Sequence, residues 1–526
     1  MTGDPALAAR TVAGAYHIHT TVSDGAKDKR EVAAAAARAG LRFIVLADHG
    51  DGTRAPARPE YVDGVLCLEG VEISTNGGHY VALGLRAATP YPLGGEPAAV
   101  VEDVRRFGGF GIAAHVDSPK PSLAWTDWGA PVDGVEWLNA DNEWRNERRV
   151  RLARVVFDYL VRPGPALASM FDRPVDALKR WDSLASRRPV VGIAGHDAHG
   201  GMRGRREDGG GLPGIPAYEA SFRSFSLRAI LDAPFTGDAG PDGERLLDAI
   251  AGGRFFTAMD GIAAPAVLDF RATSDGRDGA MGSVLPAGRT TTVSVHAAMP
   301  EGARIVAIRN GSEIAVPSSG DLALGPTTGA VRIEIRVPDA PGVPPVPWVV
   351  SNPIYFLQTE KGDRHTSFPG SVPVLLPKPG SVPVPLLWRI EKDPRSTARV
   401  AVVAGTATLS FQFAPGERAS QYAALVTDLG GRTGTFHSIE LDANASRPMR
   451  LSVQLRYPSG RWGHSVYVDD TRRITVPISD LLAADRQTGP MPDSSTAGSL
   501  LFVVDLTNML PGAAGSFSVM NVAFGR

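Results

Sequence analysis

The stretch EVAAAAARAGLRFIVLADHG, residues 31–50, joins a helical pattern to a strand pattern and indicates the fold of the first half of the chain. Alanine favours helix, and Gly40 ends the run because glycine readily adopts the conformation found at helix C-termini. The apolar run LRFIVL then predicts a buried strand, since the strands of parallel sheets are continuously hydrophobic. A helix followed directly by a buried strand predicts α/β structure.

The same alternation recurs twice before residue 200. The helical pattern AAVVEDVRRFGG precedes the apolar run FGIAAHV, and ALKRWDSLASRRP precedes VVGIAGHD. Strands and helices in series predict a parallel sheet, and a barrel is the form that we expect for residues 1–255.

Beyond residue 255 the pattern changes from helical to strictly alternating. TTTVSVHAA, ARIVAIRNG and VRIEIRVPD alternate with period two between Gly, Pro and Asp, which predicts an Ig-like β-sandwich over residues 256–358. Residues 359–395 are rich in proline and repeat PGSVPV, which predicts a semi-rigid linker. Residues 396–526 predict a second, jelly-roll-like sandwich, so we expect a multidomain chain of three modules.

Composition sets limits on partners and compartment. The net charge of -2 indicates no nucleic-acid surface, and no apolar run approaches the roughly 18 residues of a membrane span. Cys67 is the single cysteine, so any metal must be held by nitrogen and oxygen atoms. The compartment stays unknown: periplasmic or secreted if a signal peptide has been removed, and otherwise cytoplasmic.

The stretch AGAYHIHTTVSDG, residues 13–25, carries the first candidate metal ligands. His17 and His19 are two residues apart, so on a strand both imidazoles point to the same face. Two nitrogens on one side form a platform for a divalent cation, and Asp24 can turn back as a third ligand. A polar strand end is the equally simple alternative for this stretch alone.

Further candidates follow at later strand ends, where parallel α/β folds place their ligands. His49 ends one buried strand, and Asp48 beside it could orient a ligand imidazole. Glu72 could bridge two cations, although Glu69 competes for that role. His79 opens the next apolar run.

The last candidates come from two more strand ends. His115 closes GGFGIAAH, and Asp197 with His199 repeats the two-residue spacing of the opening stretch in VVGIAGHDAHG. His196 is out of phase with that pair, and it either contacts substrate or fills the turn.

In its order of motifs the chain resembles the PHP (polymerase and histidinol phosphatase) metal-dependent hydrolases. HIHTTVSDG, LADHG, GVEIST, GIAAHVD and GHDAH carry this resemblance over about residues 15–200. The segments LLDAIAGGRFFTAMDG and WVVSNPIYF look like the carbaryl-hydrolase-like (CehA/McbA-like) subgroup. The resemblance implies a distorted (β/α)7 barrel that binds two or three divalent cations of zinc, manganese or iron. The implied metal ligands are His17, His19, Asp24, His49, Glu72, His79, His115, Asp197 and His199.

Such a centre predicts hydrolysis by a metal-bound hydroxide, because clustered cations lower the pKa of water and stabilise developing negative charge. Asp24, Glu72 and His199 are the expected catalytic residues, and Arg145, Arg203 and His196 the expected substrate contacts. The expected substrate is a small-molecule phosphoester. A carboxylic ester or a carbamate is the alternative, for which the tryptophans between residues 125 and 144 could supply an apolar wall.

Two rival interpretations remain open. An amidohydrolase barrel also begins with HxH, but the SDG after it, the DH after the second strand and the final DxH argue against that family. The chain could instead be a secreted, non-catalytic protein whose C-terminal sandwich contacts glycans through RYPSGRWGHSVYVDD. In that stretch Tyr457, Trp462, His464 and Tyr467 would form a stacking surface unless the rings are core.

Overall fold

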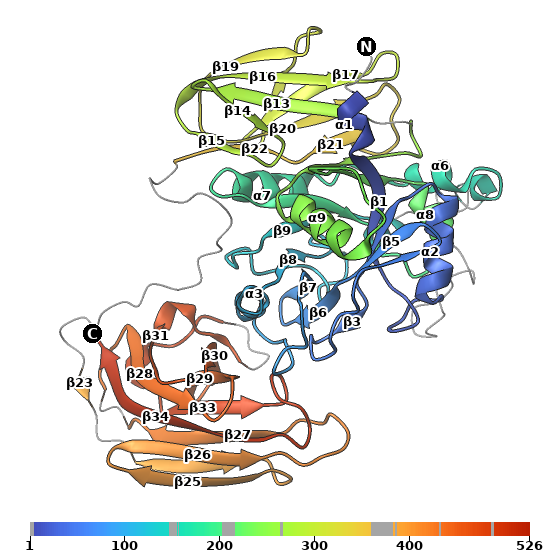
Figure 1. Cartoon of the computed structure of the whole chain (residues 1–526). Coiled ribbons are helices and arrows are strands. Elements are labelled where there is room, and N and C mark those ends of the chain that lie inside the picture. The colour runs from blue at the N-terminus through green and yellow to red at the C-terminus, as the bar shows by residue number, and fades with distance from the viewer. Residues whose placement is uncertain are drawn as a thin grey trace. The chain divides into compact units, whose positions relative to one another are not determined.

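In the computed structural model the chain divides into two compact units (Figure 1). Unit 1 comprises residues 1–51, 55–87 and 104–366, and unit 2 comprises residues 52–54, 88–103 and 367–526. The predicted module boundaries at residues 255 and 358 both fall within unit 1, and the division into three modules stays a prediction. The residues that the structure describes are 5–146, 155, 157–201, 216–263, 267–358, 382–383, 387–430, 433–484 and 489–526.

Unit 1 begins with the expected strand, helix and strand. β1 (Thr11–Ile18) and β2 (Phe43–Leu46) pair in parallel, and α2 (Lys29–Arg38) connects them. The helix starts at a capping box in which Asp28 accepts from the backbone N–H of Glu31, satisfying donors that a helix N-terminus leaves free. The helix and the strand predicted for residues 31–50 are therefore confirmed.

Three sheets contain the strands of unit 1. The largest has twelve strands and includes β1, β2, β4 (Glu60–Val62), β5 (Val65–Glu69), β11 (Ser226–Ile230), β12 (Phe255–Ala258), β15 (Val284–Pro286), β17 (Arg304–Arg309), β18 (Ser312–Ala315), β20 (Gly329–Arg336), β21 (Val349–Ser351) and β22 (Ile354–Leu357). A six-stranded sheet contains β3 (His49–Gly50), β6 (Val71–Thr75), β7 (Gly78–Leu83), β8 (Phe110–Ala113), β9 (Gly134–Asn139) and β10 (Val191–Gly195). A four-stranded antiparallel sheet contains β13 (Leu268–Ser274), β14 (Arg277–Ala280), β16 (Arg289–Ala297) and β19 (Asp321–Thr327).

The expected (β/α)7 barrel is wrong. The structure is mostly strand, at 42% against 16% helix, and the strands of residues 1–255 lie in two separate sheets rather than in one closed ring. A hairpin joins β6 to β7, which are antiparallel neighbours, where a helical crossover was expected. β1 also has an antiparallel neighbour, β11, which lies about 200 residues later in the chain. β12 then pairs with β21, so the larger sheet continues into the strands that follow residue 256.

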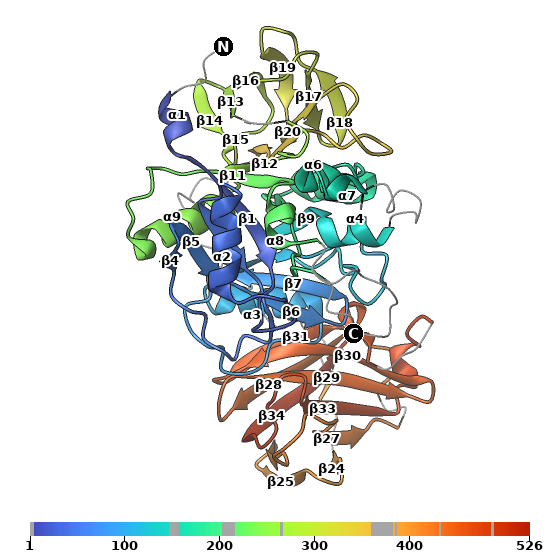
Figure 2. The same cartoon turned by 90° about the vertical axis from the view of Figure 1, so that its right-hand side faces the viewer.

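The alternating faces of β1, β2 and β5 separate two cores. Tyr16, Phe43 and Leu66 point toward a core shared with the six-stranded sheet and with α9 (Ala239–Ala251). Ala15 and Ile44 point the other way, against α2 and α8 (Tyr218–Phe222) (Figure 2). The remaining described helices of the chain are α1 (Pro5–Ala9), α3 (Pro97–Arg106), α4 (Ala140–Asn146), α6 (Pro163–Ala168) and α7 (Val175–Ala185).

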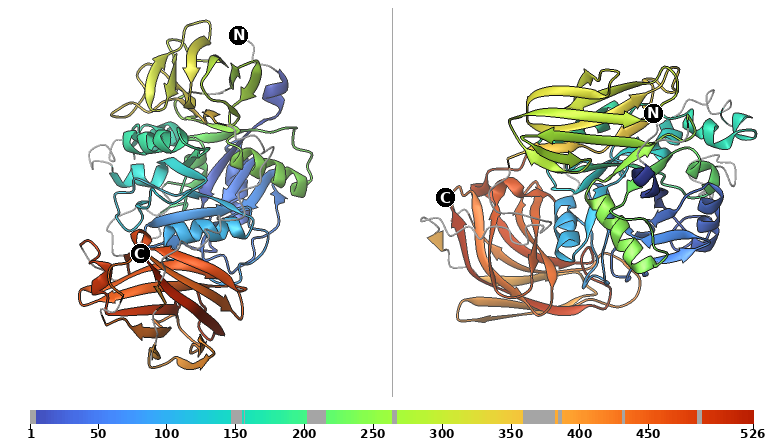
Figure 3. Two further views of the ribbon diagram at one scale, coloured as in Figure 1. Left: turned by 90° about the vertical axis from the view of Figure 1, so that its left-hand side faces the viewer. Right: turned by 45° about the horizontal axis from the view of Figure 1, so that its top comes forward.

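Unit 2 is built from two six-stranded sheets that enclose one hydrophobic core (Figure 3). One contains β23 (Val382–Pro383), β25 (Thr397–Val403), β26 (Thr406–Gln412), β28 (Ser438–Ala445), β31 (Arg472–Pro477) and β34 (Ala514–Gly525). The other contains β24 (Trp388–Lys392), β27 (Tyr422–Asp428), β29 (Met449–Tyr457), β30 (Gly460–Val468), β32 (Leu482–Ala483) and β33 (Ser499–Asp505). The β-sandwich character expected of the C-terminal region is confirmed.

Part of the predicted proline-rich linker is ordered strand. β24 lies within residues 359–395 and pairs with β27, whereas residues 359–381 and 384–386 lie outside the described part of the chain. Among the helices that are described, none is both long and apolar enough to cross a membrane.

Candidate metal centre

The candidate ligands come together in unit 1 because their motifs pair through the backbone. The N–H of His19 donates to the carbonyl of Ala198 (3.0 Å), and the N–H of Ala198 donates to the carbonyl of His17 (3.3 Å). These bonds lay the HxH motif alongside the DxH motif. In the six-stranded sheet His49 pairs with Glu72, and the N–H of Ala114 donates to the carbonyl of His79 (3.0 Å).

Three of the ligand positions adopt the left-handed backbone conformation that non-glycine residues rarely take. The φ angles are 62° at His17, 32° at His115 and 47° at Asp197. At His17 the register of β1 against β2 shifts, so this residue forms a bulge at the strand end. Such strained positions concentrate at functional sites, where the surrounding structure holds them in place.

The loop that carries Asp24 is fixed by hydrogen bonds to Asp48. Asp48 accepts from the backbone N–H of Thr20 (2.7 Å), from the Thr20 hydroxyl (2.8 Å) and from the Ser23 hydroxyl (2.7 Å). The residue after Asp24 must be glycine, because a Cβ at Gly25 would overlap the carbonyl group of His19. Asp48 therefore orients the loop, and the described contacts do not include one with an imidazole.

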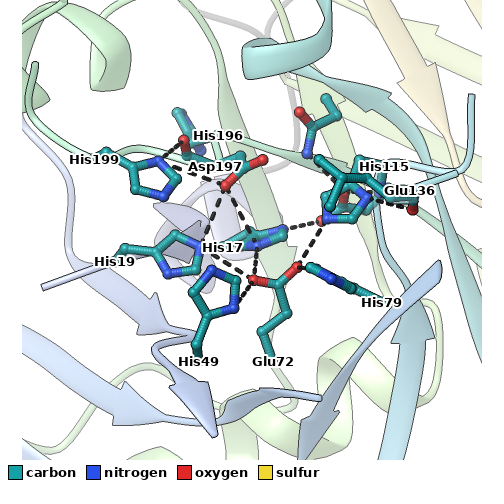
Figure 4. Close-up of polar contacts among 12 residues, drawn as sticks. His17, His19, His49, Glu72, His79, His115, Glu136, His196, Asp197 and His199 are labelled. Carbon is teal, nitrogen blue, oxygen red and sulfur yellow. Dashed lines mark hydrogen bonds and ion pairs between the residues drawn. The ribbon is translucent and has the colours of Figure 1, made fainter. Parts of the chain in front are cut away.

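Glu72 lies at the centre of the site, fully buried, with imidazoles around both of its oxygens (Figure 4). Its Oε1 is 2.8 Å from the Nδ1 of His79 and 2.8 Å from the Nε2 of His115. Its Oε2 lies 3.0 Å from the Nδ1 of His49 and 3.4 Å from the Nε2 atoms of His17 and His19. One carboxylate thus faces five histidines.

Two further carboxylates complete the arrangement. Oδ1 of Asp197 lies 3.2 Å from the Nε2 of His19 and 3.6 Å from the Nε2 of His17. Asp24 places Oδ1 3.4 Å from the Nε2 of His199 and Oδ2 3.7 Å from the Nε2 of His49. The structure therefore brings all nine predicted ligands together, and we call this set the nine-residue cluster.

Several imidazoles direct one nitrogen toward the facing side chains of the cluster, while the other nitrogen is held by a further polar group. The Nδ1 of His17 lies 2.5 Å from Glu136, that of His115 lies 3.0 Å from the carbonyl of Leu123, and that of His199 lies 2.9 Å from the carbonyl of Asp197. The Nε2 of His79 lies 3.3 Å from the Ser74 hydroxyl. Metal-binding histidines are held in this way, because the outer bond fixes the tautomer and leaves the inner nitrogen free.

The inner nitrogens are suited to cations. The Nε2 atoms of His17 and His19 are buried, and within the described part of the chain they make no hydrogen bond. A buried polar atom without a partner is costly, and ligation of a metal would remove that cost. Three overlapping groups of ligand atoms lie close enough to hold an ion: His19, Asp24, His49 and His199; His17, His19 and Glu72; and His49, Glu72 and His79.

The electrostatics of the site require positive charge. Burial would raise the pKa of Glu72, but the facing imidazoles hold it well below its ordinary value. The same balance lowers the pKa values of Asp24 and Asp197. Burial would lower the pKa of His115 and His199, yet Glu72 beside the first and the two aspartates beside the second raise both to about 9. Buried ionised carboxylates need cationic partners, which protons or bound metal ions supply.

The structure does not bring His196 into the cluster. Its ring is buried and stacks on Phe225 at a centroid distance of 4.0 Å, and its Nε2 lies 3.1 Å from the Phe225 carbonyl. Burial lowers the pKa of His196 to about 4, so the ring is neutral. This position is that of a core residue that fills the turn.

The side chains of the other two predicted substrate contacts lie outside the described part of the chain. Arg145 lies in α4 but its side chain is outside the described part, and Arg203 lies outside the described residues altogether. Trp125 and Trp137, which could have lined an apolar wall, are buried by packing.

Glu136 is the site residue that sequence reasoning missed. It lies in β9, whose six residues GVEWLN are all buried, and its carboxylate contacts His17 directly. A single acidic residue within an otherwise apolar strand was the available signal, because a charged side chain is buried only when it is paired.

The following likenesses to known proteins each cover about a quarter of this chain. No family model matches the chain. Uncharacterized protein MJ1587 of Methanocaldococcus jannaschii is 29% identical over 138 residues, which is 24% of this chain and 80% of that protein. Among solved structures, the family 11 carbohydrate-binding module from Clostridium thermocellum, in complex with a beta-1,3-1,4-mixed-linked tetrasaccharide, is 16% identical with a TM-score of 0.22. The match covers 26% of this chain and 88% of that one.

A family 29 carbohydrate-binding module is 9% identical with a TM-score of 0.18, covering 26% of this chain and 81% of that chain. Likenesses at these scores carry no argument about activity. The geometry of the nine-residue cluster is therefore the basis for assigning a function to this chain.

Proposed function

We propose that the nine-residue cluster is a multinuclear site for divalent cations and that the chain is a metal-dependent hydrolase of an ester bond. The observation that carries this proposal is the orientation of His17, His79 and His115, whose inner nitrogens converge on Glu72 while other partners hold the opposite nitrogens. The proposal includes membership of the PHP hydrolases, and the only support for that membership is the order in which the metal-ligand motifs follow one another along the sequence.

Nitrogen and oxygen ligands without thiolate suit zinc, manganese or iron. Bound divalent cations would supply Lewis acidity, lowering the pKa of water and stabilising negative charge on a substrate oxygen. His19, His49 and Glu72 each belong to two of the three ligand groups, so each of these side chains would lie beside two neighbouring ions.

The protein's own side chains give the cluster a closed side and an open side. Glu72 and His17 are fully buried and hold the interior in place. The side chains of Asp24, His49 and His199 are 55%, 37% and 27% exposed, so a small ester would reach the cluster from their side. Asp24, His49 and His199 are thus the side chains of the cluster placed to meet substrate.

A phosphoester is the substrate class that we favour. Its charged oxygens would be attracted to a group of cations, whereas an apolar acyl group would need a hydrophobic wall. The buried packing of Trp125 and Trp137 supplies no such wall at the cluster. A carboxylic ester or a carbamate remains the alternative substrate class for the same centre.

The test is a hydrolysis screen with p-nitrophenyl phosphate, a phosphodiester, an acetate and a carbamate. We expect hydrolysis of a phosphate that is lost in a chelator and restored by zinc, manganese or iron. Glu72→Gln should lose the activity. Glu69→Gln is the matched control and should keep it, since Glu69 at the end of β5 pairs with Lys29 of α2 at 3.0 Å and not with the cluster. Full hydrolysis after metal removal would contradict the proposal.

Glycan binding by unit 2 is a second candidate. The core of this unit takes Leu451, Val453 and Leu455 from β29, so Ser452 and Gln454 lie on its opposite face. The Gln454 side chain is buried and donates to the Ser452 hydroxyl at 3.0 Å, so the half-buried Ser452 is the member of this pair that can bond a sugar hydroxyl.

The rings proposed for sugar stacking do not form that surface: Tyr457, Trp462 and Tyr467 are buried. Affinity electrophoresis of the full chain in soluble β-glucans tests this candidate. Retardation that Ser452→Ala removes would support it, and unretarded migration would exclude β-glucan binding.

A further inference from the structure

Glu136 makes contact with ligands that come from two different sheets. Its Oε1 lies 2.5 Å from the Nδ1 of His17, at the end of β1 in the twelve-stranded sheet. Its Oε2 accepts from the backbone N–H of His115 at 2.6 Å, just beyond β8 in the six-stranded sheet. Asn139 donates to the same oxygen at 2.9 Å. One buried carboxylate therefore spans both sides of the cluster.

The two oxygens of Glu136 accept hydrogen bonds from different partners. Oε2 is fully used by two N–H donors, so it fixes the rotation of the carboxylate. Oε1 is left to accept the proton on the Nδ1 of His17, which keeps the Nε2 of that ring without a proton and aimed at Glu72 and Asp197.

Space for this carboxylate is provided by Gly195 on β10. A Cβ at Gly195 would overlap Oε1 of Glu136, so a larger residue would push the carboxylate away from His17. The glycine thus leaves room for the oxygen that faces the imidazole.

We propose that Glu136 is a positioning residue for the buried part of the metal centre. It sets the tautomer of His17 and fixes the backbone of His115, and it contacts none of the cations itself. This inference rests on the proposed function, because it assigns the purpose of those bonds to metal binding.

Substitution by glutamine separates shape from hydrogen bonding. In Glu136→Gln the amide oxygen can still accept from the His115 N–H and from Asn139, which turns the NH2 group toward the Nδ1 of His17. That NH2 donates, so the proton of His17 must move to Nε2, where it opposes metal binding. The variant keeps the volume of the side chain and reverses the tautomer.

The experiment measures zinc affinity of the full chain by competition with a chromogenic chelator. We expect Glu136→Gln to bind the most tightly held zinc ion about 10- to 100-fold more weakly than the wild type. Gly195→Ala should weaken binding in the same direction, because it displaces the carboxylate without removing its charge. Glu143→Gln is the matched control: Glu143 is buried and accepts the N–H of Asp172 at 2.9 Å.

A spectroscopic readout separates positioning from a general loss of stability. With 15N-labelled histidine and bound zinc, the wild type should show a strongly downfield Nδ1–H resonance for His17, because a short bond to a carboxylate deshields the proton. Glu136→Gln should lose this resonance and keep the one from His115.

The outcomes distinguish this inference from the proposed function. If the wild type binds zinc and Glu136→Gln binds it equally well, the positioning role is wrong and the metal centre stands. Equal weakening by Glu143→Gln would also overturn the positioning role. Absence of zinc binding by the wild type would overturn the metal centre, and the inference with it.

Discussion

Replacing Glu72 by glutamine should remove most of the stabilisation that metal ions give to unit 1. Glu72 belongs to two of the three ligand groups and faces five histidines, so its loss affects more than one cation. A cation present at 100 times its dissociation constant stabilises the folded state by about 2.7 kcal/mol. With roughly 2.1 cal/mol/K of unfolding entropy per residue, this raises the melting temperature of a unit of this size by about 4 °C.

For Glu72→Gln we expect affinity to fall about 100-fold, as for losses at metal sites, which leaves about 0.4 kcal/mol at the same metal concentration. The corresponding shift in melting temperature is below about 1 °C. Differential scanning calorimetry of the full chain, with and without zinc, measures both values. Glu69→Gln is the control and should keep the wild-type shift. An undiminished zinc-dependent shift in Glu72→Gln would refute the reasoning.

Three further predictions concern other parts of the chain. Gly25→Ala should cost about 1–3 kcal/mol by overpacking and weaken metal binding, as zinc competition would show; unchanged affinity would contradict it. Asp103→Ala removes one of the two carboxylates that face the buried Arg450, leaving Glu102 at 2.7 Å, and should destabilise unit 2 by about 1.5–3 kcal/mol in thermal unfolding, so a shift within error would be inconsistent. Burial lowers the pKa of His464, but Glu96 at 3.0 Å raises it overall; its stabilisation is therefore full below its ordinary pKa of about 6.5 and is lost as pH rises through the raised value. Chemical unfolding at pH 6 and pH 9 should show a smaller pH dependence in His464→Gln than in the wild type, and equal dependence would exclude this role.

The members of the nine-residue cluster could be predicted because most of them lie at or just beyond a strand end and carry side chains that can bind metals. Glu72 and His79 instead lie within β6 and β7, and Asp24 lies in a loop. The two-residue spacing of His17 and His19 places both rings on one side, as strand geometry requires. The left-handed conformation at His17 could not be predicted, because glycine is the one strong sequence signal for a positive φ and a histidine at such a position is uncommon. That conformation depends on tertiary contacts, including the pairing with Ala198.

The barrel was wrong for a reason that the sequence partly contained. Asn76-Gly77 is a strong signal for a two-residue hairpin, and it joins β6 to β7 where a helical crossover was expected. The pairing of β12 with β21 could not be predicted, since it joins segments about 90 residues apart with no local pattern.

Histidines of the same motif differ in ways that spacing does not reveal. His196 and His199 are three residues apart, yet the first stacks on Phe225 in the core and the second faces Asp24. Their placement depends on which side of the strand end meets the neighbouring elements. Glu136 is an acidic residue within an apolar strand, which indicates a buried and paired carboxylate but not that its partner is His17.

The metal content of the purified full chain tests the central claim most directly. Elemental analysis by mass spectrometry, normalised to protein concentration, should find two or three equivalents of zinc, manganese or iron per chain. The content should fall in His19→Ala, which removes a ligand shared by two of the groups. A chain that contains no divalent metal, and takes up none on incubation with these ions, would contradict the account.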